Sequence, residues 1–156
     1  MKVNITTTGE LMPSPYVNIS GERTSGRKYD TGQMENIVNL NNIDDGAVDE
    51  IYIKYSATNM LTPHQFATAI TNWRKKLKDD GMVYLSFIDS YEVFEQVVNG
   101  SLKYEHAHNL LYGEEYQNRV LLCYATVQQL LKQLGFKIIT CGGCVDHVRY
   151  LEIQKA

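Results

Sequence analysis

The segment Met82–Ile88, with the sequence MVYLSFI, limits the possible folds of this chain more than any other feature. It is apolar almost throughout, which is typical of a strand at the centre of a parallel sheet. Upstream, Thr62 and Pro63 form a helix start, with an N-cap threonine followed by proline at the first helical position. From Phe66 to Leu77, apolar residues recur at helical spacing. A helix followed by a buried strand predicts an α/β fold.

Strands and helices are predicted to alternate along the chain. Strands are expected at residues 3–5, 16–19, 36–40, 48–55, 82–88, 136–140 and 148–153. Helices are expected from Thr62 to a turn at Asp79-Asp80-Gly81, and over residues 91–98, 102–112 and 126–134. This order implies a mostly parallel sheet with helices on both faces. Helices in the N-terminal half are expected to be short or absent, because only about ten residues separate the first two strands and a polar loop at 21–33 follows.

The composition fits one globular domain over residues 1–156. The net charge of −3 argues against nucleic acid as the main partner. The sequence contains no run of 18 apolar residues and no signal-peptide pattern, so we expect a cytoplasmic protein without a membrane partner. Eleven tyrosines suit a protein interface or a homo-oligomer, and also ordinary core and surface positions.

The segment Cys141-Gly142-Gly143-Cys144 admits two interpretations. A C-x-x-C pair can bind zinc or undergo redox chemistry, but zinc needs four ligands and His147 is the only histidine nearby. A redox pair normally opens a helix after an early strand, whereas this one lies near the C-terminus. We therefore expect a glycine turn between the last two strands, and no metal.

The order of these segments resembles that of the small class I S-adenosylmethionine-dependent methyltransferases. The similar segments are KVNITTTGE at 2–10, YVNIS at 16–20, VDEIYIKYSATNML at 48–61, WRKKLKDDGMVYLSFID at 73–89 and ATVQQLLKQLGFKII at 125–139. The resemblance covers nearly the whole chain and rests on order and spacing. It implies a Rossmann-like methyltransferase fold, with a mostly parallel seven-stranded sheet, an antiparallel last strand and S-adenosylmethionine as cofactor.

The resemblance also implies cofactor contacts at the C-terminal ends of the first four strands. Thr6, Thr7 and Thr8 occupy the places of the G-x-G motif, and Gly9 follows one position late. A β-branched threonine crowds the approach of a ligand and disfavours positive φ.

Further residues take places that the resemblance assigns to the cofactor site. Ser20 stands where an acid would hold the ribose, with Glu22 as a substitute, and Asn39 stands where a carboxylate would meet the adenine amine. Tyr55 and Ser56 line the loop after the fourth strand, in which Asn59 replaces a frequent histidine. A serine contacts ribose more weakly than a carboxylate does. With the threonines, this change is expected to cost a few kcal/mol of cofactor binding, at about tenfold in affinity per 1.4 kcal/mol.

An active enzyme of this kind would transfer a methyl group to a hydroxyl of a sugar or another small molecule. This chemistry needs in-line positioning and a base. Asp89 is the first candidate base, and His106, His108 and Arg119 are candidates to face the acceptor. Asp89 also suits the N-cap of the next helix, and the two histidines fall two apart on a helix, so they point to different sides. Arg119 also suits an ion pair with Glu114 or Glu115.

The alternative is a pseudoenzyme, a methyltransferase fold without catalysis that serves as a structural or protein-interaction module. The loss of the glycines, the ribose acid and the histidine, all at one edge of the sheet, favours it. A dinucleotide site of the NAD type is not expected, because a G-x-G-x-x-G motif opening a helix is missing.

Overall fold

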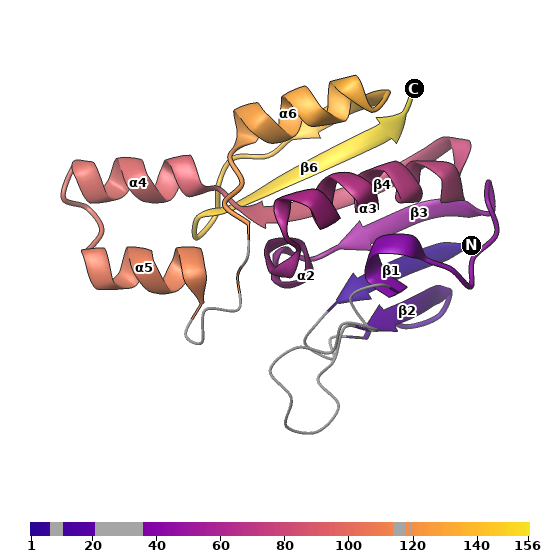
Figure 1. Cartoon of the computed structure of the whole chain (residues 1–156), viewed down its shortest axis with the longest axis horizontal. Helices are drawn as coiled ribbons and strands as arrows, with labels where there is room; N and C mark the ends of the chain where they lie inside the picture. The colour runs from indigo at the N-terminus through magenta and orange to yellow at the C-terminus, as the bar shows by residue number, and fades with distance from the viewer. Residues whose placement is uncertain (7–10, 21–35, 114–117, 119) are drawn as a thin grey trace.

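A computed structural model describes residues 1–6, 11–20, 36–113, 118 and 120–156, with Ser20 described by its backbone (Figure 1). These residues form one six-stranded sheet of order β2-β1-β3-β4-β6-β5. The strands are β1 (Lys2–Thr6), β2 (Tyr16–Ser20), β3 (Val48–Ile53), β4 (Leu77–Ile88), β5 (Phe136–Cys141) and β6 (Val148–Lys155). The first four strands run parallel, and β6 is antiparallel to β4 and β5. The predicted antiparallel last strand is confirmed, whereas the count of seven strands is wrong.

The strand predicted at residues 36–40 is wrong, because the structure has a short helical segment there. Residues 36–39 are helical, and the amide of Leu40 donates to the carbonyl oxygen of Asn36 at 2.9 Å. The nearby carbonyl of Ile37 accepts a hydrogen bond from Nε1 of Trp73 at 2.9 Å. A short apolar run has no periodicity that separates strand from buried helix, so the sequence pattern left this choice to tertiary packing.

Helix α3 (Pro63–Lys76) begins as predicted. Thr62 is its N-cap, and the Thr62 hydroxyl accepts from the amide of Gln65 while the Gln65 side chain accepts from the amide of Thr62, which is a complete capping box. The predicted C-terminal turn is wrong, because α3 ends at Lys76 and Asp79-Asp80-Gly81 lies within β4. There the register between β3 and β4 shifts, so the polar turn residues bulge out of an otherwise continuous strand.

The main core lies between the sheet and two helices on one face. Helices α3 and α6 (Tyr124–Gln133) supply Phe66, Ile70, Trp73, Val127 and Leu131, and both lie over the same side of the sheet in Figure 1. The strand residues of this core alternate with period two, as a one-sided sheet requires. They include Val3, Ile5, Ile51, Ile53, Val83, Leu85, Leu151 and Ile153.

We predicted helices on both faces of the sheet, and the other face differs from this prediction. Over β3, β4 and β6, this face carries Tyr52, Tyr84, Tyr150 and Glu152, and Tyr150 is 46% exposed. The buried side chains of α3 and α6 all belong to the core on the opposite side. In the part of the chain that the structure describes, no helix covers this face, which we call the open face.

The short connection from β1 to β2 is held by amide side chains, with no helix in its described residues 11–15. Asn18 Oδ1 accepts from Asn4 Nδ2 at 2.7 Å and from the amide of Met12 at 2.9 Å, and Asn18 Nδ2 donates to the carbonyl of Met12. These residues agree with the prediction that helices are short or absent in the N-terminal half. The side-chain amide of Asn18 satisfies the backbone groups of Met12, which a crossover helix would otherwise satisfy.

Two further helices lie beyond the ends of the strands. Helix α4 (Ser90–Val98) and helix α5 (Tyr104–Tyr112) pack side by side and form a second small core with Ile88, Val93, Ala107 and Leu111 (Figure 1). None of the helices that the structure describes has the length and apolar character needed to cross a membrane.

Lys78 in β4 donates to Asp49 in β3 at 2.6 Å, and this hydrogen bond, together with one from the N-terminal ammonium of Met1, lowers the pKa of Asp49 to about 2. A carboxyl group whose pKa is lowered by folding adds stability above its unfolded pKa, and this contribution is lost as the pH falls through the folded value. We expect Asp49→Asn to lower the melting temperature at pH 6, with a difference from wild type that shrinks below about pH 4. Asp44→Asn, an exposed control, should melt like wild type at both pH values. An Asp49→Asn deficit that does not change with pH would contradict this ion pair.

Candidate functional site

The carboxyl ends of β1 to β4 meet at one edge of the sheet, which we call the carboxyl edge. The chain order places β2 on one side of β1 and β3 on the other, so the topology switches direction between β1 and β3. Open α/β sheets bind their ligands outside the carboxyl ends at such a switch point. The residues at this point are Thr6 at the end of β1 and the segment that follows Ile53 in β3.

Thr6 is fully buried at the end of β1, opposite Ser20 at the end of β2. Its position at the carboxyl edge agrees with the place expected from the sequence. Thr7, Thr8, Gly9, Glu22 and Arg119 lie outside the described residues, so their proposed roles stay predictions.

A helix takes the place of the loop predicted after the fourth strand. Helix α2 (Tyr55–Met60) begins directly after Lys54, so Tyr55 and Ser56 lie in its first turn. Tyr55 is 43% exposed, whereas the Ser56 hydroxyl is buried and has no hydrogen-bond partner among the described residues. A buried hydroxyl without a partner is uncommon and requires an explanation. One explanation is that this hydroxyl binds a ligand.

Asn59, the residue expected in place of a histidine, makes hydrogen bonds through both polar atoms of its side-chain amide. Its Oδ1 accepts from the amide of Ile88 at 3.0 Å, and its Nδ2 donates to the carbonyl of Val120 at 3.4 Å. The side chain is almost fully buried and ties α2 to the end of β4. Both ends of the amide are therefore used in holding the carboxyl edge together.

Asp89 closes β4 and has both carboxylate oxygens engaged. Oδ1 accepts from the amide of Tyr91 at 3.2 Å, which makes Asp89 the N-cap of α4. Oδ2 accepts from Nε of Arg149 at 2.7 Å, and the Asp89 side chain is only 2% exposed. The N-cap interpretation is present in the structure, together with an ion pair that the sequence did not suggest.

Arg149 is the centre of a charged group beside the carboxyl edge. It also donates to Glu92 at 3.2 Å, and its guanidinium lies 5.3 Å from the ring centre of Tyr124. Burial lowers the pKa of Arg149, but the hydrogen bonds with Asp89 and Cys141 overcome this effect and raise the pKa above its ordinary value. The guanidinium therefore stays charged at any pH at which the protein folds.

Three histidines lie near α5, and the structure separates their surroundings. His108 lies between the rings of Tyr104 and Tyr112, with ring centres 6.3 and 5.0 Å away. His106 is exposed on a different side of the helix, as predicted, and lines a hollow of about 410 Å³ with Asp146 and His147.

His147 also lines this hollow, although the sequence interpretation did not assign it to the acceptor side. Its Nδ1 is buried without a partner among the described residues, and its carbonyl accepts from the amide of Asp89 at 2.9 Å. Asp146 and His147 have φ angles of 49° and 65°, a left-handed conformation that is uncommon outside glycine. Val145 and Val148 exchange backbone hydrogen bonds at 3.0 and 2.9 Å, so Asp146 and His147 are the central residues of a two-residue hairpin turn, which requires positive φ at both positions.

Asn39 does not lie at the end of a strand, because its segment is helical. Its Oδ1 accepts from Asn72 Nδ2 of α3 at 2.8 Å, and Asn72 also donates to the carbonyl of Val38 at 3.3 Å. Asn39 also borders a shallow hollow of about 190 Å³ together with His64 and Thr68. Its expected contact with an adenine amine stays a prediction.

The predicted connection between the last two strands is present, but the chain reverses at Asp146 and His147 rather than at the glycines, and Cys141 belongs to β5. Cys123, Cys141 and Cys144 are free thiols, and burial raises the pKa of Cys144. In the described part of the chain, no three His, Cys, Asp or Glu side chains are grouped so that they could hold a metal ion.

The fold has clear counterparts among solved structures. A Bacillus halodurans protein assigned as a methyltransferase superposes with a TM-score of 0.62 at 11% identity, over 99% of this chain and 91% of its own. A chain from the complex of the Haloferax volcanii Trm112 activator with its methyltransferase gives 0.65 at 10% identity, over 99% and 82%. The CurJ carbon methyltransferase gives 0.60 at 12% identity, and this chain spans 48% of its length.

The chain has the fold of the class I methyltransferases. No protein-family model matches the sequence, and none of the curated proteins matches it. Identities of this size show the methyltransferase fold and do not carry over an acceptor or a partner.

Proposed function

We propose that this protein binds S-adenosylmethionine at the carboxyl edge, as an S-adenosylmethionine-dependent methyltransferase acting on a hydroxyl of a sugar or another small molecule. The observation that supports this most is the Ser56 hydroxyl, which is buried without a partner in the first turn after β3. It lies next to the switch point between β1 and β3, where a fold of this kind binds its ligand.

The residues present fit the polar part of such a cofactor. Hydroxyl groups of Ser56 and Thr6 can donate to and accept from a ribose, and the buried Ser56 hydroxyl gains a hydrogen bond when a ligand supplies one. Thr7, Thr8, Gly9, Ser20, Glu22, Asn39 and Tyr55 complete the proposed contact set. S-adenosylmethionine supplies an electrophilic methyl group, and the chain must position an acceptor hydroxyl in line and accept its proton.

We assign the acceptor side to the hollow beside α5. His147 and His106 line it, and Asp89 adjoins it through the hydrogen bond from its amide to the carbonyl of His147. An imidazole with an unpartnered nitrogen is the better candidate base, because both oxygens of Asp89 are already engaged. Asp89 then holds Arg149 and the start of α4 in position, and Arg119 stays a candidate acceptor contact.

Calorimetric titration with S-adenosylmethionine and S-adenosylhomocysteine tests this proposal. We expect binding by wild type, and an affinity loss of about three- to tenfold in Ser56→Ala, the effect of one neutral hydrogen bond. Ser101→Ala is the matched control, because Ser101 is exposed in the turn after α4 and should bind like wild type. Absence of heat and of thermal stabilisation at millimolar ligand would contradict the proposal, since a ligand of the native state must raise its stability.

The second candidate is a non-catalytic methyltransferase fold used for protein interaction. The engagement of both Asp89 oxygens favours it, because this carboxylate cannot accept a proton without giving up a cap or an ion pair. Single-turnover assays with radiolabelled S-adenosylmethionine separate the two. Cofactor binding without methyl transfer to any hydroxyl acceptor in a sugar and small-molecule panel would support the non-catalytic function.

A further inference from the structure

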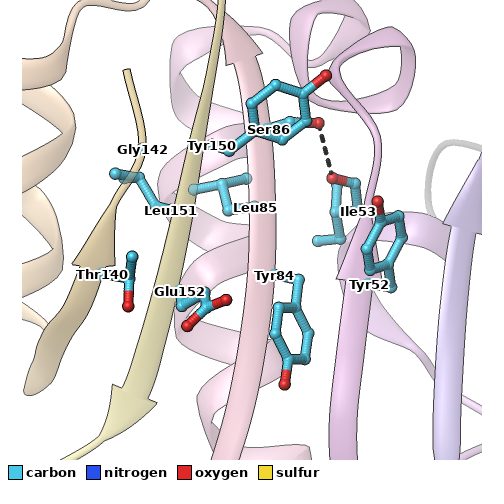
Figure 2. Close-up of a pocket in the computed structure, with 10 residues that line it drawn as sticks. All are labelled: Tyr52, Ile53, Tyr84, Leu85, Ser86, Thr140, Gly142, Tyr150, Leu151 and Glu152. Atoms are coloured by element: carbon cyan, nitrogen blue, oxygen red, sulfur yellow. Dashed lines mark hydrogen bonds between the residues drawn. The ribbon is translucent and has the colours of Figure 1, made fainter. Parts of the chain in front are cut away.

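A third hollow, of about 320 Å³, lies on the open face. Its lining comes from four strands, β3, β4, β5 and β6, and Figure 2 shows the side chains around it. The rings of Tyr52, Tyr84 and Tyr150 belong to this lining, together with the carboxylate of Glu152. Its volume lies at the lower end of the range of small-molecule sites.

The hollow exists because one small side chain is surrounded by large ones. Ser86 is cross-strand partner of Tyr150, and two residues back along β4, Tyr84 lies opposite Tyr52 and Glu152. The Ser86 hydroxyl donates to the carbonyl of Ile53 at 3.2 Å, so its hydrogen bond is made within the sheet (Figure 2). The rings of Tyr52 and Tyr84 lie 6.1 Å apart between centres. The floor is therefore strand backbone, and the walls are aromatic rings.

The charged side chain that lines this hollow is a carboxylate. Glu152 makes no ion pair within the described residues, although Lys137 lies opposite Gln154 on the same face. Burial raises the pKa of the Tyr84 hydroxyl, the carboxylates of Glu50 and Glu152 raise it further, and the Lys2 ammonium lowers it in part. Tyrosine faces are electron-rich, so rings and carboxylate attract the same kind of group.

The other end of the same face shows how such a set is used. Lys2 pairs with Glu50 at 2.9 Å, and its ammonium lies 5.8 Å from the ring centre of Tyr16. There the chain's own lysine supplies the cation for a carboxylate and a tyrosine. At Glu152 the same combination is present with more aromatic surface, and this carboxylate has no ion pair with a cation of the described chain.

We propose that this hollow is a binding site for a small organic cation, a molecule with an alkylammonium or guanidinium group. The cation lies against the tyrosine rings and pairs with the Glu152 carboxylate, while its apolar part fills the space above Ser86. This site is separate from the carboxyl edge, and it does not depend on whether S-adenosylmethionine binds there.

Amide NMR titration with choline and with arginine amide tests the site, with dimethylbutanol as the neutral isostere of choline. We expect saturable shifts at Tyr52, Tyr84, Tyr150 and Glu152 for at least one of the two cations. The isostere should bind at least about tenfold more weakly, because it lacks the charge that the rings and carboxylate recognise. Saturating S-adenosylhomocysteine should leave the cation affinity unchanged.

Glu152→Gln keeps the shape of the side chain and removes its charge, so the fold should persist while cation affinity falls about tenfold. Glu105→Gln, the same change at an exposed position of α5, should leave the affinity unaltered. If neither cation shifts these residues, the proposal is overturned. The same conclusion holds if the isostere binds equally well, or if Glu152→Gln binds like wild type.

Discussion

Replacing Trp73 by alanine is expected to lower the free energy of unfolding by about 3–5 kcal/mol. The indole is fully buried in the middle of the core between α3 and the sheet. Its Nε1 also donates to the carbonyl of Ile37 at 2.9 Å. Alanine leaves a cavity and a buried carbonyl without this donor, and the helical residues 36–39 lose their anchor on α3.

Chemical denaturation of matched variants measures this effect. Trp73→Phe keeps most of the ring volume and loses the hydrogen bond, so its deficit should be smaller, about 1–3 kcal/mol. Tyr91→Ala removes an aromatic ring that is 66% exposed, and it should stay within about 0.5 kcal/mol of wild type. Should Trp73→Ala fail to fold, the Trp73→Phe value still tests the claim. Equal stability of Trp73→Phe and wild type would contradict the role given to the indole nitrogen.

The second large effect is expected for Arg149→Met, at about 3–5 kcal/mol of unfolding free energy. The substitution removes the guanidinium that pairs with Asp89, and it leaves a carboxylate that is only 2% exposed without its cation. The cost comes from the unpaired buried charge more than from the loss of the ion pair itself. The contact with the Tyr124 ring at 5.3 Å is lost as well.

A double-variant cycle separates these terms. Asp89→Asn combined with Arg149→Met removes the stranded charge and keeps an oxygen for the N-cap, so much of the lost stability should return. Glu92→Gln, at a side chain that is 31% exposed, should cost less than about 1 kcal/mol. If the double variant is no more stable than Arg149→Met, the ion pair with Arg149 is not what offsets the cost of burying the Asp89 carboxylate.

The elements that local chemistry defines were predictable from the sequence. The helix start at Thr62 and Pro63 and the apolar stripe through Trp73 are local signals, and α3 begins where they predicted. The strand at 82–88 was also identified correctly, because its residue pattern does not depend on distant partners, whereas the turn before β6 lies at Asp146 and His147 and not at the predicted glycines. The order of the elements was enough to indicate the methyltransferase fold.

The features that depend on distant packing were not predictable. Asp89 and Arg149 are 60 positions apart, and only the antiparallel register of β4 and β6 brings them together. Residues 36–40 carry an apolar run that suits a strand equally well, until Trp73 and Asn72 bind its carbonyls. The open face was not predicted, for a similar reason. Its tyrosines suit a strand beneath a helix as well as an exposed one.

The positions of some proposed site residues in the fold were predictable, and their roles stay predictions. Thr6 and Ser56 lie at the switch point, where the resemblance places them, whereas Ser56 belongs to a helix and Asn59 ties that helix to the end of β4. The unpartnered hydroxyl of Ser56 and the unpartnered nitrogen of His147 are properties of the packed structure, and no sequence pattern signals them.

Hydrogen–deuterium exchange of the wild-type protein, with and without saturating S-adenosylhomocysteine, tests most directly whether the carboxyl edge is the ligand site. We expect slower exchange around Thr6 and through residues 54–59, because a bound nucleoside shields this end of β1 and the first turns of α2. Exchange at the open face, around Tyr84 and Tyr150, should not change. Unchanged exchange throughout the carboxyl edge, or protection confined to the open face, would contradict cofactor binding at this edge.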